Sequence, residues 1–195
     1  MKEKEEKEGK EVPVFIEGET IYFIPHNSEY INLYVKWFND PKVRKYAREI
    51  VPIRVDDAKK WFEESERGTP NYIGFVIWHK KDMKPIGVIG LGLIDWVNGW
   101  ANVGLSIGEP AYWNKNIATE ATELLIEYAF NELNLNKVRG GAAVENVGSW
   151  SVAEKIGFKY EGIQKDEMYA NGKYHNGKTY HILKKDWMNR KNKNE

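Results

Sequence analysis

Apolar residues near the start of the chain follow a strand pattern first and a helical pattern afterwards. The run 20–24 is rich in β-branched and aromatic residues, which predicts a strand. Apolar residues then recur three and four positions apart in two stretches, which predicts two helices with Ser28 and Asp56 as their N-caps. These apolar residues are Ile31, Tyr34, Val35 and Phe38 in the first helix and Ala58, Trp61 and Phe62 in the second.

The middle and end of the chain change to strands joined by tight turns. Three strand-like runs lie within 71–108, and Asn98-Gly99 marks the hairpin between the last two. A long amphipathic helix, a short strand and a short helix follow, and a closing hairpin is predicted about Asn171-Gly172. This order of elements predicts an α/β sandwich with a mixed sheet.

The composition fits one domain with two polar ends. Apolar residues make up 42% of the 195 positions, which is enough for the core of a single domain over 12–188. A mobile charged tail is expected over 1–11 and a polar tail over 189–195. Lysine plus arginine equals aspartate plus glutamate at 29 each, so no charge bias indicates nucleic acid or a membrane as a partner.

Cysteine, histidine and hydropathy patterns exclude several classes of protein. The chain has no cysteine, which excludes disulfides, thiolate metal sites and a cysteine nucleophile. Its four histidines are scattered without a metal-binding spacing, so no metal is expected. No apolar run approaches the roughly 18 residues of a membrane span, and no signal-peptide pattern is present. We therefore expect a soluble cytoplasmic protein.

The stretch EPAYWNKNIATEA at 109–121 has the pattern of a strand end, a tight loop and a helix start. Backbone N–H groups at a helix N-terminus attract anions such as phosphate, and Lys115 adds positive charge. Asn114 and Asn116 stand where such loops usually carry glycine, and asparagine is the side chain that best tolerates positive φ after glycine. An ordinary loop with Asn116 as helix N-cap is the alternative. The sequence favours a phosphate-binding loop.

Five segments, taken in order, resemble the motifs of one family. They are WFNDPKVRKYA at 37–47, IGVIGL at 86–91, GLSIGEPAYWNKNIATEA at 104–121, VENVGSWSVAEKIGFKYEG at 144–162 and YANGKY at 169–174. They resemble the GNAT superfamily of acetyl-CoA-dependent N-acetyltransferases, and specifically its RimJ/RimL-type branch, the ribosomal-protein alanine acetyltransferases. The resemblance extends over about residues 17–187, which no single motif match could achieve.

The resemblance implies a fold and a place for acetyl-CoA. The family fold is α/β, a twisted mixed sheet of about seven strands flanked by about four helices. It is splayed between the fourth and fifth strands, which here correspond to 102–108 and 137–144. Backbone groups of Ser106, Ile107 and Gly108 are then expected to bind the pantetheine arm and to stabilise the oxyanion of the reaction. Ordinary sheet pairing of these three residues is the alternative.

The family's pyrophosphate-binding pattern and its pantetheine-binding pattern also have counterparts here. By resemblance, Asn146 binds the pantetheine chain and Ser149 lies near the sulfur of the coenzyme. Glycine in place of Asn116 is expected to keep or improve affinity for the coenzyme, because glycine reaches positive φ at no steric cost. The residues expected in the pyrophosphate loop are Trp113, Asn114, Lys115, Asn116, Ile117, Ala118 and Thr119.

The groups that move protons are less well defined. Many family members place a tyrosine acid seven residues after the asparagine, whereas this chain has Ala153 there. Ser149 is then the favoured partner of the leaving thiolate, and a role as N-cap of a helix over 150–157 is an equal alternative. Direct attack by a neutral amine also needs a base or a water chain, for which Asp95, Glu109 and Glu167 are candidates.

The acceptor amine stays open at this point. A protein or peptide N-terminal α-amine is favoured, and a polyamine, an amino acid or an amino sugar is the alternative within the enzyme class. A non-catalytic acetyl-CoA-binding module is the alternative outside it. The oligomeric state also stays open, with a homodimer as one candidate.

Overall fold

The fold is described from a computed structural model for residues 12–46, 51–62, 70–170 and 172–194. The predicted tail over 1–11 and Asn171 of the predicted hairpin turn lie outside the described residues. The strands are β1 (Ile16–Glu17), β2 (Ile21–Pro25), β3 (Tyr72–His79), β4 (Lys84–Asp95), β5 (Trp100–Ile107), β6 (Lys137–Ala143), β7 (Lys159–Ala170) and β8 (Lys173–Leu183). The α-helices are α1 (Ile31–Asn39), α2 (Val55–Lys59), α3 (Ile117–Asn131), α4 (Val147–Ile156) and α5 (Lys184–Asn194). Single 3-10 turns are η1 (Ser28–Tyr30), η2 (Val43–Tyr46), η3 (Lys60–Phe62) and η4 (Pro110–Tyr112).

The strands form one mixed sheet in the order β1-β2-β3-β4-β5-β6-β8-β7. Strands β1 to β5 follow one another as antiparallel neighbours, and β6, β8 and β7 form a second antiparallel part. Within the described residues, β5 and β6 are the only parallel neighbours, and α3 makes the crossover between them. The predicted α/β fold with a mixed sheet is confirmed, and the described part of the sheet has eight strands because the two-residue β1 adds an edge.

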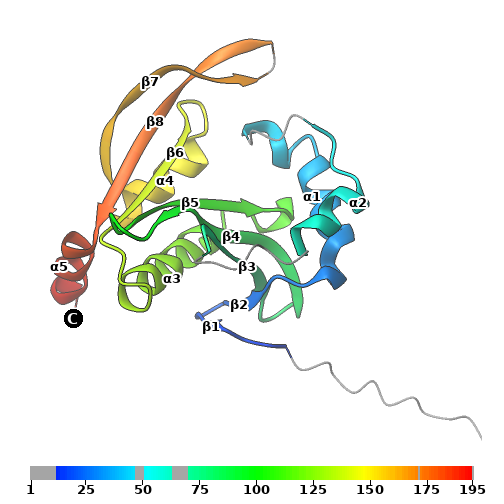
Figure 1. The fold of residues 1–195 in the computed structure, drawn as a ribbon, viewed down its shortest axis with the longest axis horizontal. Helices are drawn as coiled ribbons and strands as arrows, with labels where there is room; N and C mark the ends of the chain where they lie inside the picture. Colours follow the sequence, from blue (N-terminus) through cyan, green and yellow to red (C-terminus); the bar gives the residue numbers. More distant parts are fainter. Residues whose placement is uncertain (1–11, 47–50, 63–69, 171, 195) are drawn as a thin grey trace, which may run out of the picture.

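The two faces of the sheet carry different helices (Figure 1). Alternate residues of a strand point to opposite faces, and β3 shows this with Ile77 in one core and Val76 in the other. Helix α3 buries Leu125 in the larger core. Helix α1 buries Tyr34 and Trp37 in the smaller core, where each side chain is only 1% exposed. Burial of side chains this large stabilises the fold by about 1.5–3 kcal/mol each.

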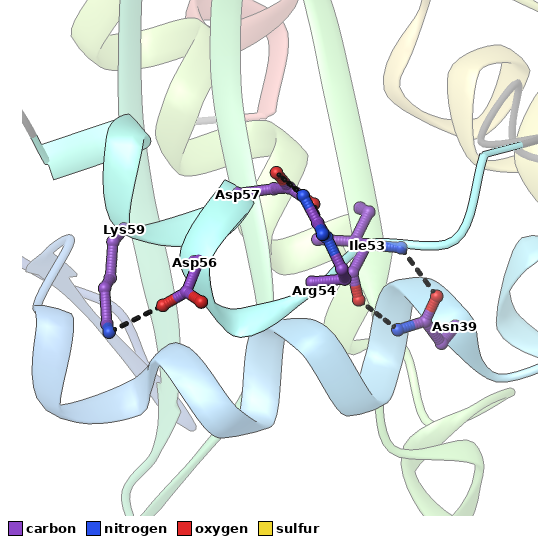
Figure 2. Close-up of polar contacts among 6 residues, drawn as sticks. All are labelled: Asn39, Ile53, Arg54, Asp56, Asp57 and Lys59. Atoms are coloured by element: carbon purple, nitrogen blue, oxygen red, sulfur yellow. Dashed lines mark hydrogen bonds and ion pairs between the residues drawn. The ribbon is translucent and has the colours of Figure 1, made fainter.

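Asn39 joins the end of α1 to the segment that leads into α2 (Figure 2). Its Nδ2 donates to the carbonyl of Ile53 at 2.7 Å, and its Oδ1 accepts from the N–H of Ile53 at 3.0 Å. These paired bonds satisfy both backbone groups of Ile53 in a segment without regular pairing. Asn39 of the resembling segment 37–47 therefore has a structural role here.

Both helix caps predicted near the start of the chain are wrong by one or two positions. Helix α2 begins at Val55, so Asp56 lies in its first turn and accepts a bond of 2.8 Å from Lys59 (Figure 2). Ser28 lies inside η1, and the side chain of Asn27 accepts the capping bond instead. Serine and asparagine both make good caps, so composition alone does not choose between Asn27 and Ser28. The N-cap of α2 is Arg54, whose side chain makes no capping bond.

The segment predicted as a polar tail over 189–195 is helical up to Asn194, as the end of α5. Trp187 anchors this helix, because its side chain is 3% exposed within the larger core. Arg190 then donates to the carbonyl groups of Lys155, at 3.0 Å, and of Ile156. The remaining predicted domain limits stay predictions. Within the described residues, no helix is both long and apolar enough to cross a membrane.

Candidate active site

A gap opens in the sheet where β5 and β6 diverge. Across residues 100–143, all of which the structure describes, the two strands pair only from Trp100 to Asn102 on β5. The carbonyl of Gly99 accepts from the N–H of Lys137 at 3.1 Å, so the odd-numbered residues of β5 direct their backbone groups toward β6. The backbone of Ile107 accordingly faces the gap at the end of β5. This gap corresponds to the predicted splay.

The three residues predicted to bind through their backbone have different surroundings. The N–H of Gly108 donates to the carbonyl of Ile86 at 2.9 Å, so this donor belongs to the sheet. Ser106 lies opposite Val88 in the antiparallel pair with β4. Ile107 faces the gap, and its carbonyl accepts from Nε1 of Trp113 at 2.9 Å. Of the predicted three, Ile107 is therefore the residue best placed to offer its backbone N–H to a ligand.

The loop before α3 has the backbone conformation that the sequence predicts. Asn114 has φ +59° and Asn116 has φ +61°, so both adopt the left-handed conformation. Asn116 occupies the N-cap position of α3, but its side chain makes no capping bond. The N-terminus of α3 starts at Ile117, so the amides of Ile117, Ala118 and Thr119 form its first turn. The role of Asn116 as an ordinary side-chain cap is thereby excluded.

Tyr112 fixes this loop against the hairpin between β3 and β4. Its side chain is 7% exposed, and its hydroxyl donates to the carboxylate of Asp82. Burial, together with this hydrogen bond, raises the pKa of Tyr112 to about 12. The ring meets the ring of His79 edge-on, with the centroids 4.9 Å apart. The Nζ of Lys115 lies 5.4 Å from the centroid of the Tyr112 ring, within the range of a cation–π contact.

Asn146 caps the helix that follows β6. Its Oδ1 accepts from the N–H of Ser149 at 3.3 Å, and α4 begins at Val147. Ser149 therefore lies in the first turn with an exposed side chain, and its predicted role as N-cap of a helix over 150–157 is wrong. The side chain of Trp150 donates to the carbonyl of Val144 at 2.9 Å, which ties the first turn to the end of β6.

A contact that the sequence pattern did not indicate lies beside this cap. Glu145 and His175 approach each other at 2.9 Å between Oε1 and Nδ1, and Nε2 of His175 lies 3.1 Å from the carbonyl oxygen of Ala170. A hydrogen bond from His175 is the main cause that lowers the pKa of the Glu145 carboxyl. The contact joins the closing hairpin to the residue before Asn146. Thirty positions separate the partners, so no local pattern could have revealed it.

Glu109 is the candidate carboxylate that the fold places nearest the end of β5. Its Oε1 accepts from Nε1 of Trp37 at 2.8 Å and from Nζ of Lys36 at 3.0 Å. Partial burial raises the pKa of Glu109, but the hydrogen bonds from Trp37 and Lys36 outweigh it and leave the pKa below its usual value. Glu109 thus holds α1 against the end of β5 as an ionised carboxylate.

The other two candidate carboxylates are Asp95, on β4, and Glu167, on β7. Asp95 pairs with Trp100, which lies at the opposite end of β5 from Ile107. Along an extended strand, Trp100 and Ile107 are about 23 Å apart. Its carboxylate accepts bonds from the hairpin turn, at 2.8 Å and 2.7 Å from the backbone and side chain of Asn98. Glu167 is exposed on β7. The structure therefore does not bring Asp95 together with Glu109, and Asp95 serves the turn.

Within the described residues, no three histidine, cysteine, aspartate or glutamate side chains gather closely enough to hold a metal ion. What the fold does bring together at the end of β5 is a sheet gap, a left-handed loop and the first turn of a long helix. These parts suit a ligand that combines an extended polar chain with phosphate groups, because strand edges bind the former and helix N-termini the latter.

Comparisons with known proteins agree with these features. Residues 21–159 match the family described as Acetyltransferase (GNAT) domain. The chain is 29% identical over 156 residues to the Uncharacterized N-acetyltransferase p20 of Bacillus licheniformis, covering 78% of this chain and 86% of the relative. It is 43% identical over 105 residues to the Putative ribosomal N-acetyltransferase YdaF of Bacillus subtilis (strain 168), covering 54% of this chain and 57% of the relative.

A solved structure shares the fold over most of its length. The spermidine N-acetyltransferase of Vibrio cholerae, solved in complex with CoA and spermine, superimposes with a TM-score of 0.80. It is 22% identical and covers 87% of this chain and 98% of its own chain, so it shows the fold alone. An α/β fold with a splayed mixed sheet, together with N-acetyltransferase relatives, defines the class of enzyme as an N-acetyltransferase. The chain belongs to the GNAT acetyltransferase family.

Proposed function

We propose that this enzyme transfers the acetyl group of acetyl-CoA to the N-terminal α-amine of a protein or peptide, by direct attack in a ternary complex. The left-handed backbone at Asn114 and Asn116 supports acetyl-CoA as the donor, because it lets the loop approach a pyrophosphate at the first turn of α3. The backbone of Ile107 faces the gap in which the family resemblance expects the pantetheine arm. The family resemblance expects Asn146, the N-cap of α4, and Ser149, in its first turn, to contact the same arm and its sulfur.

The observation that carries the choice of acceptor is the pairing of the carboxylates. Glu109 is bound by Lys36 and Trp37, and Glu145 is bound by His175. A polyamine carries several positive charges and needs several carboxylates that are not already paired. An N-terminal α-amine carries one charge. The likeness of the chain to YdaF, whose printed name is Putative ribosomal N-acetyltransferase, also supports a protein acceptor.

Ser149 is proposed to assist departure of the thiolate. Its hydroxyl is exposed in the first turn of α4 and is not needed as the cap. A serine hydroxyl is a weak acid, so it acts mainly as a hydrogen-bond donor to the departing sulfur. The predicted homodimer and the cytoplasmic location stay predictions, as do the other site residues named from the sequence.

Thiol release from acetyl-CoA, measured with a panel of amines, tests this proposal. The panel contains N-terminal peptides, the same peptides blocked at the α-amine, spermidine and free amino acids. We expect the highest kcat/KM with unblocked peptides. Spermidine as the best acceptor would instead establish the polyamine function, and binding of acetyl-CoA without release for any amine would establish a binding module. Asn116→Val is the negative control, and it should bind acetyl-CoA more weakly than the wild type. A β-branched residue resists the φ of +61° that position 116 adopts.

The pH profile of the same assay gives an independent measure of the acceptor class. Only the neutral amine attacks, so the rate should rise with pH and level off above the pKa of the acceptor. That pKa is about 8 for a peptide α-amine and about 10 for an alkylamine such as the lysine side chain. A midpoint near 8 supports the α-amine, and a midpoint near 10 contradicts it.

A further inference from the structure

Lys155 reaches from α4 to the loop in front of α3. Its Nζ donates to Oδ1 of Asn116 at 3.0 Å, although the two residues are 39 positions apart. Asn116 is the last residue before the helix, so this bond brings a positive charge to the N-terminus of α3. Lys155 belongs to the segment at 144–162 that resembles the family, but the pattern alone did not single it out.

Lys155 makes one hydrogen bond through its backbone and one through its side chain. Its carbonyl accepts from Arg190 of α5 at 3.0 Å, which holds the backbone at the end of α4. The side chain of Asn116 makes no capping bond to its own helix, so its amide oxygen is free of that role and binds the ammonium of Lys155. A lysine ammonium has three donors, and the bond to Asn116 uses one of them.

We infer that Lys155, held by Asn116, is a positioning residue for the phosphate groups of the acetyl donor. This inference rests on the proposed function, which places the pyrophosphate at the first turn of α3. Helix amides and a lysine ammonium at the same place attract the same anion, and their effects on a phosphate add. The pair would therefore make the enzyme select phosphate-bearing thioesters such as acetyl-CoA over S-acetylpantetheine, which lacks phosphate.

The contact reverses an expectation drawn from the sequence. Glycine at position 116 keeps the left-handed backbone, and on that ground it was expected to keep or improve affinity for the coenzyme. It also removes the oxygen that holds Lys155. The structure therefore predicts that Asn116→Gly weakens binding of acetyl-CoA.

The test is calorimetric binding of acetyl-CoA to the full chain and to four variants. Lys155→Met should raise Kd about tenfold, as expected for loss of one hydrogen bond to a charged group at an exposed site. Asn116→Gly should raise Kd by a smaller factor, and the double variant should match Lys155→Met because both changes remove one interaction. Lys184→Met is the matched control, since Lys184 donates to Asn134 at 3.1 Å and Asn134 also has a left-handed φ of +54°. Its Kd should equal that of the wild type.

Turnover of S-acetylpantetheine separates a phosphate contact from a folding defect. Its KM should be the same for the wild type and for Lys155→Met, and the two proteins should have equal Tm. An unchanged Kd for acetyl-CoA in Lys155→Met, or an equal loss with both thioesters, would overturn the inference. If the wild type itself binds no acetyl-CoA, the proposed function fails first, which is a result distinct from either of these.

Discussion

Gly108 lies where a single added methyl group has no room. An ideal Cβ at this position would lie within 2.6 Å of three carbon atoms of the Trp37 indole, well inside the 3.4 Å at which ordinary van der Waals contact begins. Trp37 cannot easily move, because it is 1% exposed and its Nε1 is bound to Glu109 at 2.8 Å. Gly108→Ala should therefore destabilise the protein by overpacking.

The size of this effect follows from known overpacking costs. We expect a loss of about 2–3 kcal/mol in the free energy of unfolding, which lowers Tm by roughly 4–12 °C for a domain of this size. Gly104→Ala is the control four residues earlier, within β5, because a Cβ there meets nothing within 4 Å. Alanine at position 104 should leave Tm unchanged or raise it slightly, since it restricts the unfolded chain.

Thermal and denaturant unfolding of the two variants is the assay. Equal shifts of Tm for Gly108→Ala and Gly104→Ala would refute the packing argument, because an added Cβ meets Trp37 only at position 108. A further check is the loss in free energy of unfolding that Gly108→Ala causes when Trp37 is already replaced by leucine. This loss should be smaller there, since the smaller side chain leaves room for the added methyl group.

Three further changes test the polar residues of the site and of the β4–β5 turn. Ser149→Ala should leave Tm unchanged, because Asn146 caps α4, and it should lower kcat more than it raises KM for acetyl-CoA. A lower Tm with unchanged kcat would show that Ser149 has a structural role instead. Asp95→Ala should lower Tm without changing kcat/KM, because its carboxylate binds the β4–β5 turn; a large loss of kcat at wild-type Tm would contradict this. Glu145→Gln should lower Tm at neutral pH, because the hydrogen bond from His175 lowers the pKa of Glu145 and so stabilises the fold above its ordinary pKa of about 4.3. That difference should disappear as the pH falls through the folded pKa, and thermal melts in which it persists in acid would refute the assignment.

The backbone of the loop before α3 could be predicted because it depends on local residue type. Left-handed backbone is costly for most side chains and cheaper for asparagine, so Asn114 and Asn116 in a tight loop were informative by themselves. The period of apolar residues predicted most helices and strands for the same reason, but it did not predict the short strand β1 or the polar helix α5. Cap positions were less secure, as Ser149 and Asn146 show, because either residue type can accept the capping bond.

The roles of the candidate carboxylates could not be predicted, because they depend on distant partners. Glu109 is 72 positions from Trp37, and nothing near it in the sequence indicates that its carboxylate is already bound. Lys155 was missed for the same reason, since its partner Asn116 lies in another motif. Close packing of Gly108 on Trp37 likewise joins two segments that each resemble the family separately.

The state of Glu109 makes this candidate carboxylate a poor base for the acceptor amine. A peptide α-ammonium has a pKa of about 8, so transfer of its proton to an ordinary glutamate of pKa about 4.3 is uphill by about 5 kcal/mol. The hydrogen bonds from Trp37 and Lys36 lower the pKa of Glu109 further, which makes this transfer less favourable still. Loss of the proton to water before the attack needs no such base, and it makes the fraction of neutral amine the quantity that sets the rate. We therefore expect the midpoint of the pH profile to report the pKa of the acceptor, because the ion pair with Lys36 and the hydrogen bond from Trp37 make Glu109 a weaker base.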